Sequence, residues 1–138
     1  GWTSMFPELM KVFENNDSKD IKSLILRLIV DVKDQSVVPH IVALIKNVED
    51  EDEKSLLVSS CWQSRLDFSY YLNLFSEIVV TNDYQTALEA FTVIENSLIN
   101  ASEESIKKQL QYLKNSLSTV ETEKKLLVSE LIKTIETF

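Results

Sequence analysis

The chain has 138 residues, a formal net charge of −8, and 44% hydrophobic and 26% charged residues, which are ordinary values for one soluble globular domain. One Gly and two Pro leave little material for tight hairpins, so the composition argues against a β-rich fold and for helices. The single cysteine, Cys61, excludes an intramolecular disulfide, and no apolar run approaches the ~18 residues of a membrane span; we therefore expect a cytoplasmic protein.

Apolar residues recur at helical spacing along the chain, in segments of about 10 to 17 residues. Short polar breaks with Ser, Asn or Asp separate these segments and indicate helix starts. Two of the breaks have capping-box spacing, Asn82 with Gln85 and Ser118 with Glu121. The pattern predicts eight helices, at about residues 6–15, 19–32, 36–47, 52–64, 69–81, 83–99, 102–117 and 119–137.

The segments also repeat. A shift of 32 residues places Pro7 of "PELMKVFENNDSKD" on Pro39 of "PHIVALIKNVEDED", and a further shift of 31 places Asp52 on Asp83. This gives three units of two antiparallel helices, at 6–33, 36–65 and 68–99, which must stack because a single hairpin cannot cover its own apolar faces. The predicted core comprises Leu24, Ile25, Leu44, Leu57, Cys61, Phe75, Leu88 and Phe91.

The units resemble the HEAT-like repeat family of the short kind, with about 31 residues per repeat. The resemblance rests on "SVVPHIVALIKN", "DEDEKSLLVSSCW" and "DFSYYLNLFSEIV" followed by "NDYQTALEAFTVI", and it covers residues 6–99 as three repeats. It implies an all-α protein in which stacked hairpins form an alpha-alpha superhelix. It also implies a concave face lined by second helices, with Lys54, Val58, Gln85, Glu89, Thr92 and Asn96.

Residues 100–138 do not continue the repeat register well, and they form an amphipathic hairpin of their own. Its first helix has apolar residues at Ile106, Leu110, Leu113 and Leu117, and its second helix has them at Leu127, Leu131, Ile135 and Phe138. We expect this hairpin to cap the open end of the stack within the same domain. A dimerisation or docking surface is the alternative.

Charge is concentrated in the middle of the chain. Residues 48–104 carry twelve acidic residues against Lys54 and Arg65, a net charge of −10, and the rest of the chain carries +2. Such a surface repels phosphate backbones, so we expect a basic protein segment as partner and no nucleic acid. Seven of the twelve aromatic residues lie within 62–91. The candidate partner-binding residues are Tyr70, Tyr71, Tyr84, Gln85, Glu89, Thr92 and Asn96.

Catalytic and metal-binding signals are weak. The only histidine, His40, follows Pro39 in a helix, and Cys61 lies in an apolar run where a free cysteine is usually a buried hydrophobe. The acidic run at 49–53 lacks the glycine turn of a calcium loop and is explained by the dipole of the helix that it opens. We expect no catalysis, no cofactor and no metal.

These features favour a non-enzymatic interaction scaffold, monomeric or weakly dimeric, with an acidic surface for a basic segment of another protein. Two alternatives remain open. One is an enzyme of the kind that some helical-repeat proteins resemble, such as a DNA glycosylase or a bilin lyase. The other is a structural domain that only self-associates through its C-terminal hairpin.

Overall fold

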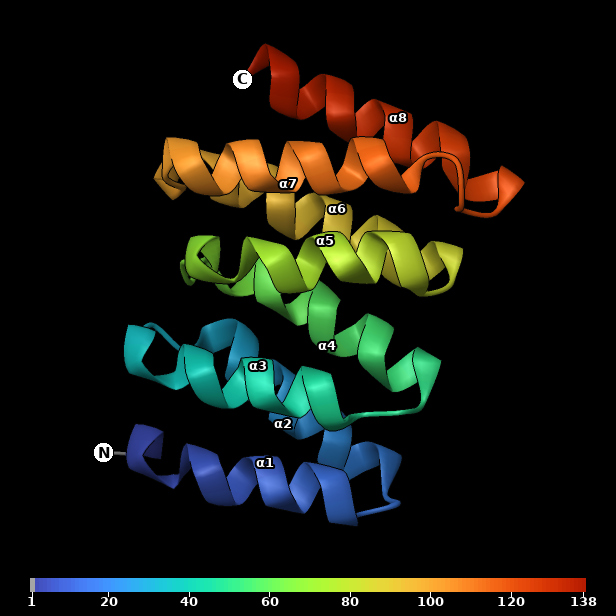
Figure 1. Cartoon of the computed structure of the whole chain (residues 1–138). Coiled ribbons are helices and arrows are strands. Elements are labelled where there is room, and N and C mark those ends of the chain that lie inside the picture. The colour runs from blue at the N-terminus through green and yellow to red at the C-terminus, as the bar shows by residue number, and fades with distance from the viewer. Residues whose placement is uncertain (1) are drawn as a thin grey trace. The chain divides into compact units, whose positions relative to one another are not determined.

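A computed structural model describes residues 2–138, with side chains from Ser4 onward. The described residues form eight α-helices joined by short connections and 3-10 turns, without a β-strand, so the all-α prediction is confirmed (Figure 1). The chain divides into two compact units, one ending at Leu66 and the other running from Asp67 to Phe138. The 3-10 turns are η1 (Trp2–Met5), η2 (Gln35–Val37), η3 (Ser69–Tyr71) and η4 (Leu98–Asn100).

The first unit contains two helical hairpins. Within it α1 packs on α3 and α2 packs on α4. The first helices of the two hairpins are therefore neighbours, and so are the second helices. Lys22 of α2 forms an ion pair with Glu53 of α4, and its ammonium lies 5.3 Å from the centroid of the Phe13 ring. The four helices are α1 (Phe6–Asn15), α2 (Lys19–Asp31), α3 (Val38–Asn47) and α4 (Glu51–Ser64).

The second unit repeats this arrangement. The closest pair is α5 with α6, and α7 and α8 pack on α5 and α6 respectively as well as on each other. A 3.0 Å ion pair between Lys114 and Glu136 joins the last two helices. The four helices are α5 (Leu72–Thr81), α6 (Tyr84–Ser97), α7 (Glu103–Ser116) and α8 (Thr122–Thr137).

Helix starts follow local hydrogen-bonding chemistry. Side chains of Ser18, Asp50, Asp83 and Ser102 each accept a hydrogen bond from the amide three residues later, which satisfies one orphan donor of the first turn. The two predicted capping boxes are wrong. Asp83 rather than Asn82 caps α6, because its carboxylate accepts from the Thr86 amide at 2.9 Å. α8 begins only after Glu121, because residues 117–120 form a turn closed on the Ser116 carbonyl.

Most of the predicted core is correct, and the exceptions in the third unit have a geometric cause. Ile25, Leu44, Leu57, Cys61 and Phe75 are all buried. Leu24 and Leu88 are exposed, at 58% and 39%, and Phe91 is only half-buried. The capping residues Ser18, Asp50 and Asp83 lie 32 and then 33 residues apart, so the 31-residue shift used for the third unit was two residues short.

The terminal hairpin also departs from its pattern at one end. Leu113, Leu127, Leu131 and Ile135 are buried as predicted, and Ile106, Leu110 and Leu117 are half-buried. Phe138 is 67% exposed, because it follows the last helical residue, Thr137, and does not continue the α8 stripe. The apolar face of α8 therefore ends at Ile135.

Candidate functional site

The α5–α6 hairpin is the part of the chain with the most one-sided charge. The chain has no Lys or Arg between Arg65 and Lys107. The same stretch contains seven acidic residues: Asp67, Glu77, Asp83, Glu89, Glu95, Glu103 and Glu104. Ion pairs of this unit join Glu104 to Lys108 and Lys114 to Glu136 on α7 and α8. The hairpin therefore carries an acidic surface that no basic residue of its own helices neutralises.

Five of the predicted binding residues lie on α6. Tyr84, Gln85 and Asn96 are exposed, and Glu89 and Thr92 are half-buried. The opposite side of α6 is buried through small side chains, among them Ala87 and Ala90, which allow the helix to lie close against α5. The same small side chains leave the larger residues of α6 on the outside.

Tyr70 and Tyr71 lie at the other end of the hairpin. They belong to the 3-10 turn before α5, with ring centroids 5.6 Å apart in an edge-to-face arrangement, and Tyr70 is 89% exposed. The ten residues of α5, roughly 15 Å at 1.5 Å per residue, separate them from Tyr84. The predicted set is thus spread over both ends of the hairpin.

The expected concave stripe needs correction on α4. Val58 is fully buried, and Lys54 is half-buried. Leu57, Val58 and Cys61 together cover a wide arc of the helix, so the residue predicted to be accessible at 58 belongs to the core. The exposed side of α4 instead carries Leu56, at 55%.

Two leucines missed by the sequence analysis lie on neighbouring helices of the second unit. Leu88 on α6 is 39% exposed and Leu126 on α8 is 72% exposed. Each lies two residues, about 200° of helix rotation, from buried residues before and after it, so both point away from the core. Leu126 is flanked at helical spacing by Glu123 and Glu130, and this mismatch could have identified it, whereas Leu88 lies at such a spacing from Tyr84 and Phe91 and looks like a core residue.

The two leucines occupy corresponding positions on neighbouring helices. The helices α6 and α8 pack on each other and run in the same direction (Figure 1). The first turn of α8 lies beside the start of α6, because the Lys124 ammonium donates to the Asn82 carbonyl at 2.6 Å. Leu88 and Leu126 are each the fifth residue after the capping residue, Asp83 or Glu121.

Acidic side chains surround these apolar positions. Glu123 and Glu130 lie three residues before and four after Leu126, and Glu95 lies seven after Leu88, which are same-side spacings on a helix. Lys133 is the basic residue at such a spacing on α8. We define the α6–α8 face by its exposed residues, Tyr84, Leu88, Glu95, Glu123, Leu126, Glu130 and Lys133.

Lys124 fixes the geometry beneath this face. Its side chain is buried, at 3% exposure, and its ammonium donates to the carbonyls of Val79, Val80 and Asn82 at 3.2, 2.6 and 2.6 Å. These carbonyls lie at the end of α5, where the last turn has no intrahelical donors and the helix dipole favours a cation. One lysine thus ties α8 to the turn that leads into α6.

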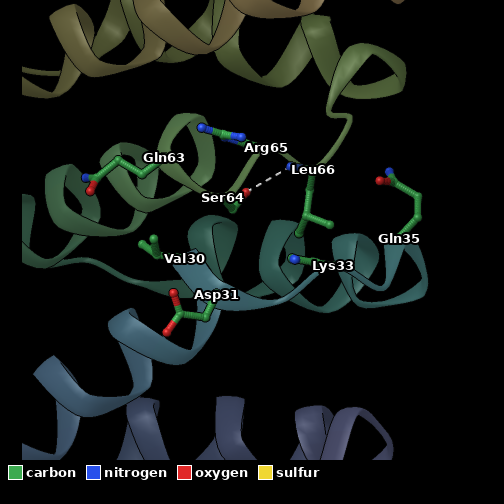
Figure 2. A pocket seen from close by; sticks show the side chains of 8 residues that line it. All are labelled: Val30, Asp31, Lys33, Gln35, Gln63, Ser64, Arg65 and Leu66. Atoms are coloured by element: carbon green, nitrogen blue, oxygen red, sulfur yellow. Dashed lines mark hydrogen bonds between the residues drawn. The ribbon is translucent and has the colours of Figure 1, made fainter.

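The first unit contains a cleft of about 440 Å³ at the C-terminal ends of α2 and α4 (Figure 2). At its wall Arg65 has a φ of 63°, and the Ser64 hydroxyl holds this turn by donating to the Cys61 carbonyl and accepting from the Leu66 amide. The lining residues are Val30, Asp31, Lys33, Gln35, Gln63, Ser64, Arg65 and Leu66. The positive charges of Lys33 and Arg65 in the cleft are balanced by Asp31 and by the negative dipole ends of two helices. The net charge of the cleft therefore favours neither an anionic nor a cationic ligand.

His40 and Cys61 have different surroundings. His40 is exposed and borders a shallow hollow of about 310 Å³ with Ser4 and Ser36. No hydrogen bond joins its ring to another residue among those described, whereas a nucleophile–base pair requires one. Cys61 is buried, and burial raises the pKa of its thiol well above the ordinary value of 9.0. In the described part of the chain no group of His, Cys, Asp or Glu has the arrangement of a metal site.

The acidic run at 49–53 has structural roles in the first unit. The Asp50 carboxylate accepts from the Glu53 amide at 2.9 Å, and the Glu53 carboxylate pairs with Lys22. Across residues 2–138, no helix has the length and apolar character that crossing a membrane requires. Comparison of the chain with family models, curated proteins and solved structures found no match in any of the three.

Proposed function

We propose that the protein is a non-enzymatic interaction module that binds a basic segment of another protein through the α6–α8 face. The observation that carries this proposal is the composition of that face. Tyr84, Leu88 and Leu126 are large apolar side chains that the fold leaves exposed, and the charged residues beside them are mostly acidic. Exposed apolar groups with a charged rim are typical of protein-binding surfaces.

Charge and apolar contact have separate roles in this function. Exposed charge pairs each contribute only about 0–1 kcal/mol, so the acidic residues set the association rate and the preference for basic partners. Tyr84, Leu88 and Leu126 supply the apolar contact that slows dissociation. The same acidic field disfavours nucleic acids, whose phosphates it repels.

We also propose that the hairpins form a HEAT-like stack, the superhelical arrangement that the repeats resemble. The neighbour pattern inside each unit supports this. First helices pack on first helices and second helices on second helices, in both α1–α4 and α5–α8. Such nearest-neighbour packing is typical of helical repeats, which use the exposed surface of one helix layer for binding.

Affinity capture from a native lysate tests the function. The wild-type chain is compared with Tyr84→Ala/Glu95→Lys and with a matched control, Val12→Ala/Glu14→Lys, which also changes an exposed apolar residue and an exposed acid. We expect wild type and control to retain the same proteins with basic segments, released by raised salt, and the α6 variant to lose them. Identical capture by all three chains would contradict the proposal.

A further inference from the structure

The partner of the α6–α8 face can be described more closely. Resting on the proposed function, we propose that this face binds a basic amphipathic α-helix, with Leu88 and Leu126 as two apolar anchors. The two anchors belong to neighbouring helices that run in the same direction, and each lies at the same position after its capping residue. Packed helices have axes about 8–10 Å apart.

This separation matches the repeat of a helix. Residues i and i+7 lie on the same side of an α-helix and are about 10 Å apart along its axis. A helix that lies across α6 and α8 can therefore place an apolar residue on Leu88 and another, two turns later, on Leu126. An extended strand places same-side residues about 6.6 Å or about 13 Å apart, which matches this separation less well.

The charges around the anchors indicate which charged residues the bound helix carries. Glu123 and Glu130 flank Leu126 on α8, where Lys133 is the one basic residue at a same-side spacing, and α6 carries Glu89 and Glu95 without any basic residue. Lys or Arg beside the apolar residues of the bound helix would meet these acids, whereas an acidic helix would be repelled. A second copy of the chain fits poorly, since it would oppose the same acidic residues and carries a net charge of −8.

Tyr84 extends the apolar area at one end of the face. It is 44% exposed and lies one turn before Leu88 on α6. An aromatic ring with an accessible hydroxyl can cover the edge of a bound helix while its hydroxyl remains in water. The face therefore offers three apolar contacts in a triangle, two on α6 and one on α8.

Binding of labelled peptides to the full chain tests this inference by fluorescence anisotropy. The probe is a capped peptide of about 15 residues, long enough to form a helix, with leucines seven residues apart and lysines, arginines and alanines elsewhere. A second peptide has the same composition with the leucines on opposite sides of the helix. A third replaces every basic residue with glutamate.

Leucine variants give the decisive comparison. Leu88→Gln and Leu126→Gln change the proposed anchors, and Leu24→Gln and Leu56→Gln are matched controls because these leucines are also exposed, at 58% and 55%, on helices of the other unit. All four lie outside the core, so circular dichroism should show an unchanged fold. We expect the first peptide to bind tightest, each anchor variant to weaken it about 5-fold or more, and the controls to leave it unchanged.

The outcomes separate this inference from the proposed function. If both basic peptides bind equally and the anchor variants have no effect, while Glu95→Lys weakens both, the helix inference is overturned and the acidic binding function stands. If the control leucines matter as much as Leu88 and Leu126, or if no peptide binds, the inference is also overturned. Self-association of the chain that Leu88→Gln abolishes would assign the face to a second copy instead.

Discussion

Each unit ties a second helix to its neighbours through one lysine, and the two lysines do so by different chemistry. In the first unit Lys22 is half-buried and pairs with Glu53, beside the ring of Phe13. In the second unit Lys124 is buried and donates to three carbonyls at the end of α5. Removing one charge of a half-exposed pair leaves its partner in water, whereas removing Lys124 leaves buried carbonyls unsatisfied.

The two units also differ in their exposed leucines. Leu24 and Leu56 lie on α2 and α4, which carry Lys19, Arg27 and Lys54, although Asp52 and Glu53 also precede Leu56. Leu88 lies on α6, which has no basic residue, and Leu126 lies on α8, which also carries Lys125 and Lys133. Because α6 is the one helix of these four without a basic residue, we place the basic partner on the second unit.

The largest effect on stability is expected for Lys124→Met. Three carbonyls at the end of α5 lose their donor, and we expect the free energy of unfolding in urea to fall by about 2–4 kcal/mol. Lys125→Met, at an exposed neighbouring position, is the control and should change stability by less than about 0.5 kcal/mol. Equal, small effects of both substitutions would show that the carbonyl contacts contribute little.

Cys61 in the first unit should make the free energy of unfolding depend on pH. Burial raises the pKa of its thiol above the ordinary value of 9.0, so the unfolded chain loses the thiol proton at a lower pH than the folded chain. The free energy of unfolding therefore keeps the contribution of the protonated thiol below pH 9.0. Above pH 9.0 the free energy of unfolding decreases by about 1.4 kcal/mol for each further pH unit. Urea unfolding from pH 8 to pH 10 measures it.

The variant Cys61→Ala isolates this effect. Substitution of a buried side chain lowers stability at every pH, but it removes the thiol and with it the additional loss above pH 9.0. Tyr112 adds a dependence at higher pH, because burial, and secondarily the charge of Glu77, raises the pKa of its hydroxyl above 10.0. If the free energy of unfolding falls equally steeply above pH 9.0 in wild type and in Cys61→Ala, the pH dependence does not come from the Cys61 thiol.

Lys22→Met should have a smaller effect than Lys124→Met. The lost ion pair and cation–π contact together contribute about 1 kcal/mol, and raised salt should reduce the difference from wild type. A double-mutant cycle with Glu53→Gln measures the pair directly, and we expect a coupling energy of about 0.5 kcal/mol. A loss comparable to that of Lys124→Met would remove the distinction between the two lysines.

Ser76→Ala should increase stability slightly. The Ser76 hydroxyl on α5 is fully buried and has no hydrogen-bond partner among the described residues. Its removal eliminates an unsatisfied polar group, and we expect a gain of about 1 kcal/mol in thermal or urea unfolding. Destabilisation by this substitution would indicate that the hydroxyl has a partner, such as a buried water molecule.

Helix positions could be predicted from the sequence because each depends on local signals. Asp50 and the acids after it mark the start of α4, and the apolar period marks its buried side. The exact rotation of a helix depends on its neighbours, so an error of two residues in the repeat shift placed Leu88 in the core. Leu24 and Leu88 look like core residues in a sequence, and only the packed structure separates them from Ile25 and Ala90.

The candidate face could be predicted in part. Charge and aromatic content identified α6, with Tyr84, Gln85 and Asn96 exposed as required of binding residues. The contribution of α8 could not be predicted, since Leu126 and Glu130 lie about forty residues further along the chain and meet α6 only through the packing of the fold. Lys124 was missed for the same reason, because its partners are backbone carbonyls without a sequence signal.

The central claim is that the second unit, through α6 and α8, is the binding surface. Hydrogen exchange of the full chain with and without the basic leucine-bearing peptide tests it most directly. We predict slower exchange confined to amides of α6 and α8, with α2 and α4 unchanged despite Leu24 and Leu56. Protection of α2 and α4, or no protection on α6 and α8 at saturating peptide, would contradict the claim.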